Sequence, residues 1–89
     1  MNKHEVQDKR RELADKLPTL SVRVFALKGR HYQGCGFHWC LVKDLGGLML
    51  RLNDYDNPFS EENLLVLEVI YEDLLDRVGK AEAQLLPTT

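Results

Sequence analysis

The chain has 89 residues and a formal net charge of −2, and 44% of its residues are hydrophobic and 29% charged. This length fits one domain with a thin core, and the composition excludes a disordered tail. The sequence also lacks an apolar run of the roughly 20 residues that a membrane-spanning helix requires. Nine charges stand in the first 17 residues and the chain has two cysteines. We therefore expect a single domain over residues 1–89 in the reducing cytoplasm, with residues 1–3 and 80–89 as candidate flexible ends.

The charge is distributed unevenly along the chain. Residues 1–17 carry a net charge of +1, residues 18–53 carry +4, and residues 54–89 carry −7. A basic middle and an acidic end attract each other within one molecule or between two copies, and they offer a partner either sign of surface.

Residues 3–17 are predicted to form a short helix that ends at Pro18, because a residue before proline avoids helical backbone angles. Its apolar residues lie on one narrow stripe with Arg10 in the middle; these residues are Val6, Leu13, Ala14 and Leu17. A stripe this narrow predicts a helix at the periphery of the fold.

Three runs with strand-like composition follow, over residues 20–28, 35–42 and 47–52. Their valines, aromatic residues and leucines favour strands, and glycine-containing segments separate them. Leu48, Leu50 and Leu52 alternate with Met49 and Arg51, which is the pattern of a half-buried strand. The sequence thus predicts an α+β fold of order α-β-β-β-α, with a three-stranded antiparallel sheet between two helices.

The last predicted element is a long helix. Either Asn57 or Ser60 caps its start, and it runs to about Val78, with a continuation past Gly79 left open. At 100° per residue, one broad apolar face results, made of Leu64, Leu67, Ile70, Tyr71, Leu74, Leu75 and Val78. Spacings of four and three along this face permit packing against another helix.

Two apolar residues of this helix, Leu65 and Val69, project from its opposite face. Carboxylates surround them there, from Glu61, Glu68, Glu72 and Asp76. Two alternatives remain open: the N-terminal helix covers this strip within the monomer, or the strip contacts another chain. The second alternative predicts a non-enzymatic protein–protein interaction domain, an inhibitor or an adaptor, with a basic protein partner or a homodimer as its complex.

Nucleic-acid binding is the competing hypothesis. The segment 28–33 combines basic, aromatic and glycine residues, as phosphate-binding loops do. The candidate residues are Arg23, Lys28, Arg30, His31 and Tyr32.

Metal binding and catalysis have weaker support. Of the four cysteines and histidines in residues 31–40, only His38 and Cys40 share a face of the predicted strand, which is too few ligands for a zinc site. No acidic residue lies near this pair in sequence to orient a catalytic histidine. We therefore expect no enzymatic activity, no metal and no cofactor.

Overall fold

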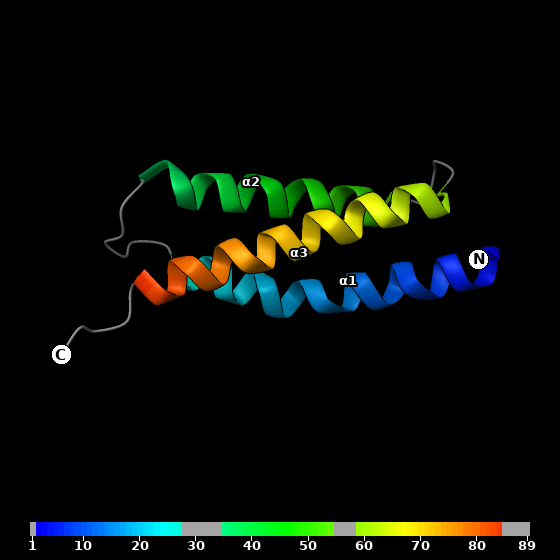
Figure 1. Cartoon of the computed structure of the whole chain (residues 1–89), viewed down its shortest axis with the longest axis horizontal. Helices are drawn as coiled ribbons and strands as arrows, with labels where there is room; N and C mark the ends of the chain where they lie inside the picture. The colour runs from blue at the N-terminus through cyan, green and yellow to red at the C-terminus, as the bar shows by residue number, and fades with distance from the viewer. Residues whose placement is uncertain (1, 28–34, 55–58, 85–89) are drawn as a thin grey trace.

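The structure is a computed structural model that describes residues 2–27, 35–54 and 59–84. Three helices make up nearly all of these residues: α1 (Lys3–Ala26), α2 (Cys35–Leu52) and α3 (Glu61–Gln84). They pack side by side into an elongated bundle of 51 × 22 × 18 Å, in which α1 and α3 run parallel and α2 runs antiparallel to both (Figure 1). No helix in these ranges is both long and apolar enough to cross a membrane.

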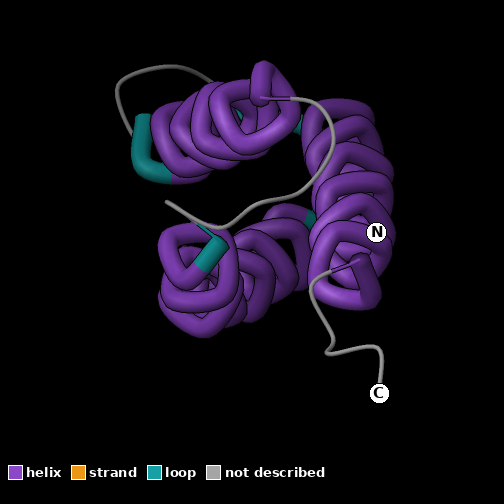
Figure 2. Tube along the Cα trace, turned by 90° about the vertical axis from the view of Figure 1, so that its left-hand side faces the viewer, coloured by secondary structure: helices purple, strands orange, loops and turns teal. Residues whose placement is uncertain are grey.

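The core lies along the axis between the three helices, which occupy the corners of a triangle when the bundle is viewed end-on (Figure 2). Each helix contributes buried residues at alternating spacings of three and four. In α1 and its C-cap they are Val6, Arg10, Leu13, Leu17, Leu20, Val24 and Leu27; in α2, Leu41, Leu45, Leu48 and Leu52; in α3, Leu64, Leu67, Tyr71, Leu74, Val78 and Ala81. This heptad spacing is that of helices packed knobs-into-holes.

The predicted three-stranded sheet is wrong, because within the described residues all three strand-like runs belong to helices. Strand propensities differ by only about 1 kcal/mol, and packing commonly overrides them. In the third run Leu48 and Leu52 are buried, whereas Leu50 between them is exposed. The burial therefore follows a helical period of four residues, and the fold is an all-α bundle.

The predicted helix end at Pro18 is also wrong, since α1 continues to Ala26 with Pro18 exposed on its outer side. A proline inside a helix costs about 3 kcal/mol. Full burial of one leucine or valine stabilises by about 1.5–3 kcal/mol, and the extended helix buries Leu20, Val24 and Leu27. The gain from these residues exceeds the cost, so α1 is a full member of the core and not a peripheral helix.

The other helix ends agree with their local sequence. Asn2 caps α1 by accepting a 2.9 Å hydrogen bond from the Glu5 backbone N–H. Of the two candidate caps for α3, Ser60 is the one used, because its Oγ accepts from the Asn63 N–H. The helix continues past Gly79 to Gln84 and buries Ala81.

Candidate protein-interaction surface

The heptad register of α3 determines which of its apolar residues remain outside the core. With Leu64 and Leu67 buried against the other helices, Leu65, Val66 and Val69 face outward and are 50%, 51% and 68% exposed. We call these three residues the α3 strip. Neighbouring exposed apolar residues of this kind mark a contact surface more often than isolated ones do.

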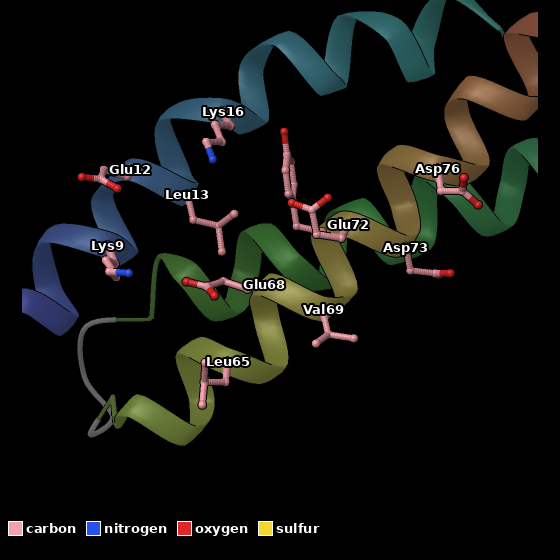
Figure 3. A pocket seen from close by; sticks show the side chains of 11 residues that line it. Lys9, Glu12, Leu13, Lys16, Leu65, Glu68, Val69, Glu72, Asp73 and Asp76 are labelled. Carbon is pink, nitrogen blue, oxygen red and sulfur yellow. The ribbon is translucent and has the colours of Figure 1, made fainter. Parts of the chain in front are cut away.

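One flank of the α3 strip borders a groove of about 780 Å³ between α1 and α3. Leu13 and Tyr71 are the buried residues in its lining. Figure 3 shows Lys16 reaching from α1 toward this groove, with Glu68 and Glu72 on the α3 side, while Leu65 and Val69 project away from α1. Five carboxylates and two lysines line the groove, which makes it acidic.

The carboxylates of this groove differ in how they are neutralised. Asp73 lies 3.0 Å from Arg77 Nε and Asp76 lies 3.0 Å from Lys80 Nζ, both as pairs one helical turn apart. Within the described part of the chain, Glu68 and Glu72 form neither an ion pair nor a hydrogen bond. The charges of Glu68 and Glu72 on α3 are thus available to another molecule, as is that of Glu12 across the groove on α1.

The opposite flank of the α3 strip borders a second groove, of about 550 Å³, between α2 and α3. Its α2 wall carries Lys43, Gly47 and Arg51, and Val69 lines this groove as well as the first. Three cations and two carboxylates line it, so this flank is basic. The α3 strip therefore lies between an acidic groove and a basic one.

Arg77 of α3 crosses the basic groove and forms an ion pair with Asp44 of α2. Burial alone lowers the pKa of Arg77, but its hydrogen bond to Asp44 and the charges of Asp44 and Asp73 raise that pKa above its ordinary value. Arg77 is therefore a structural cation that aligns α2 with α3.

The residues predicted for partner binding lie together on one side of the bundle. Five of the six line the acidic groove, namely Leu65, Glu68, Val69, Glu72 and Asp76. Glu61 is exposed in the first turn of α3, outside this lining. The N-terminal helix does not cover Leu65 and Val69, because α1 packs against the other face of α3.

The residues predicted for nucleic-acid binding are only partly described. Arg23 forms a two-point ion pair with Glu82, with Nε donating to Oε2 over 3.0 Å. This hydrogen bonding raises the pKa of Arg23 and lowers that of Glu82. Lys28, Arg30, His31 and Tyr32 lie outside the described residues.

The two residues considered for a metal site are part of α2. Cys40 is an exposed free thiol, and the His38 side chain lies outside the described part. The prediction that His38 and Cys40 share one face of a strand is wrong. Both belong to a helix, where residues two apart are separated by about 200° around the axis. No group of three or more metal-ligating side chains occurs among the described residues.

Sequence reasoning missed the residues that α1 and α2 contribute to the grooves, mainly Lys16, Lys43, Gly47 and Arg51. The signal that locates them is the alternating spacing of buried residues at 13, 17, 20, 24 and 27 and at 41, 45, 48 and 52. Comparison with known proteins adds no further constraint, because no family model, curated protein or solved structure matches the chain.

Proposed function

We propose that this chain is a non-enzymatic protein-interaction domain that uses the α3 strip and its flanking carboxylates to bind a protein partner. The observation that carries the proposal is the exposure of Leu65, Val66 and Val69 beside the unpaired carboxylates of Glu68 and Glu72. Apolar residues supply the area removed from water, and the adjacent charges orient the partner and reject wrong ones.

The chemistry of this surface defines the partner it fits. Glu68 and Glu72 on the acidic flank have no ion-pair partner among the described residues, so a complementary surface presents lysine or arginine beside an apolar stripe. We propose that the domain acts as an adaptor, or as an inhibitor that occupies a basic binding site, because its acidic flank complements a basic surface. Among the described residues, the lining of the two grooves has no serine, cysteine or histidine, which supports a binding role over nucleophilic catalysis.

A titration with a synthetic amphipathic helix of leucine and lysine tests this proposal directly. The peptide is added to ¹⁵N-labelled protein and amide shifts are followed by NMR. We expect shifts concentrated at residues 65–76, and we expect them to vanish in a Leu65→Asp/Val69→Asp variant. Both side chains are exposed, so the substitutions leave the core intact.

A Val22→Asp/Phe25→Asp variant is the matched control, since these two residues form an exposed apolar pair on the outer side of α1. It is expected to bind the peptide as the wild type does. Equal binding by the wild type and the Leu65→Asp/Val69→Asp variant, or shifts centred on α1, would contradict the proposed surface.

A further inference from the structure

The two flanks of the α3 strip carry opposite charge, which makes this face of the molecule complementary to itself. The α1 flank carries five carboxylates against Lys9 and Lys16, with Glu68 and Glu72 unpaired within the described residues, and the α2 flank contributes Lys43 and Arg51. The side chains of Lys43 and Arg51 are both exposed, and neither forms an ion pair within the described residues. A single molecule thus presents both halves of a charged contact, one on each side of an apolar ridge.

We propose that the partner of the α3 strip is a second copy of this chain, bound about a two-fold axis parallel to α3. The inference rests on the proposed function and identifies its partner. Rotation by 180° about such an axis places the α2 flank of each copy over the α1 flank of the other. A two-fold axis perpendicular to the helices would instead place acidic flank on acidic flank and basic on basic, which is repulsive.

The axial positions of the charges agree with this arrangement. The contact between Asp44 and Arg77 puts residue 44 of α2 level with residue 77 of α3. Since α2 runs antiparallel to α3 (Figure 1), Arg51 lies level with residue 70, and Lys43 with residue 78. Rotation about the α3 direction preserves these levels.

Each cation therefore arrives beside a carboxylate of the other copy. At about 1.5 Å per residue, Arg51 of the second copy lies within about 3 Å, along the axis, of both Glu68 and Glu72. Lys43 of the second copy lies within the same axial distance of Asp76, which also pairs with Lys80 of its own helix. Leu65 and Val69 of the two copies meet between these charged rows and exclude water from the contact.

Gly47 leaves room for a close contact on the basic flank. It lies in the middle of α2 and lines the α2–α3 groove, and a Cβ added there would meet nothing within 4 Å, as at Gly46 and Gly79. A second copy can therefore approach the α2 backbone closely at this position.

The test is a charge exchange measured by sedimentation equilibrium at low salt. One variant carries Glu68→Lys and Glu72→Lys, and the other carries Lys43→Glu and Arg51→Glu. In each variant alone the two flanks have like charge, so self-association is expected to weaken by about tenfold or more. In an equimolar mixture both flanks are complementary again, so a heterodimer of near wild-type affinity is expected.

Three results overturn the inference. They are a wild-type chain that stays at 10.3 kDa at every concentration tested, a dimer that neither charge variant weakens, and two weakened variants whose mixture does not associate. If the wild type is monomeric but still binds the leucine–lysine peptide at residues 65–76, the partner is not a second copy of the chain, and the proposed function remains intact. A dimer that persists in the Leu65→Asp/Val69→Asp variant removes the second copy from the α3 strip, and the peptide titration then decides the proposed function separately. Circular dichroism confirms that each variant remains helical.

Discussion

The buried guanidinium of Arg10 donates from Nε to the carbonyl oxygen of Leu52 over 2.8 Å, at the residue where α2 ends. Its Nη2 donates to the carbonyl oxygen of Asp54 over 2.9 Å, and its Cζ lies 4.2 Å from the centre of the Phe59 ring. A cation at this place also opposes the negative end of the α2 dipole. Arg10, although it lies inside the apolar stripe of α1, therefore links α1 by hydrogen bonds to the end of α2 and to the start of the segment that leads into α3.

Arg10→Met is expected to destabilise the fold by about 1–3 kcal/mol, because it leaves the carbonyl of buried Leu52 without its charged donor. Methionine retains most of the apolar stem, so the loss reports mainly on the hydrogen bonds. The measurement is urea denaturation followed by circular dichroism. Arg11→Met is the control, since Arg11 is exposed on the adjacent position and its loss should change stability by less than about 0.5 kcal/mol. Equal effects of the two substitutions would contradict the capping role.

Leu48 and Leu50 provide a direct test of the helical register of α2. Leu48→Ala should cost about 2–5 kcal/mol, since the side chain is fully buried. Leu50→Ala should cost less than about 0.5 kcal/mol, since Leu50 is 76% exposed. Chemical denaturation of both variants measures the difference. On a strand these two residues would share one face, so similar losses at both positions would favour the sheet over the bundle.

Substitutions at Gly46 and Gly47 test whether α2 is a continuous helix at this glycine pair, where the sequence alone indicated a turn. Both have open space where a Cβ would lie. Gly46→Ala and Gly47→Ala are each expected to stabilise the monomer by about 0.5–1 kcal/mol, because alanine has the lower entropy cost in a helix interior. Thermal denaturation at low protein concentration measures this. A loss of stability from either alanine would indicate a turn with left-handed backbone at the pair.

The sequence predicted α3 well because its periodicity is unambiguous. Its buried face from Leu64 to Val78, the cap at Ser60 among two candidates, and the exposed position of Leu65 and Val69 all agree with the structure. The error lay in α1 and α2, where valine and aromatic residues suggested strands. The runs over residues 20–28 and 35–42 had apolar residues at both odd and even positions, which a two-residue period does not produce on a half-buried strand. Continuation of the spacing of α1 through Pro18 was the available signal for a longer helix.

The candidate site was predictable only where it depends on α3 alone. The carboxylates and the apolar strip follow from one helical wheel, which is why five of six predicted residues line one groove. Lys43 and Arg51 reach the same surface through the packing of α2 against α3, which a predicted strand could not place. The pairing of Arg23 with Glu82 joins residues 59 positions apart, a relationship that composition does not reveal.

The ion pair between Arg23 and Glu82 predicts a pH-dependent contribution to stability. The hydrogen bond from Arg23 lowers the pKa of Glu82 below its ordinary value of 4.5. A carboxylate with a lowered folded-state pKa stabilises the fold fully above its unfolded-state pKa, and this contribution is lost as the pH falls through the folded-state pKa. Because both side chains are more than one third exposed, the contribution is less than about 1 kcal/mol.

Glu82→Gln should therefore lower stability at neutral pH and make no difference in acid below the folded-state pKa of Glu82. Urea denaturation of the wild type and the variant across this range measures the difference. An Arg23→Gln variant is the control. In this variant, adding Glu82→Gln should cause no further change in stability. A difference that stays constant down to strong acid would show that the carboxylate charge is not its source.

We propose the α3 strip as the contact surface of the molecule. Its most direct test is sedimentation equilibrium of the wild type beside the Leu65→Asp/Val69→Asp variant, with circular dichroism to show that both are helical. We expect a wild-type mass of twice 10.3 kDa at high concentration and a variant that remains at 10.3 kDa. A folded variant that associates as strongly as the wild type would contradict the assignment of the α3 strip as the contact surface.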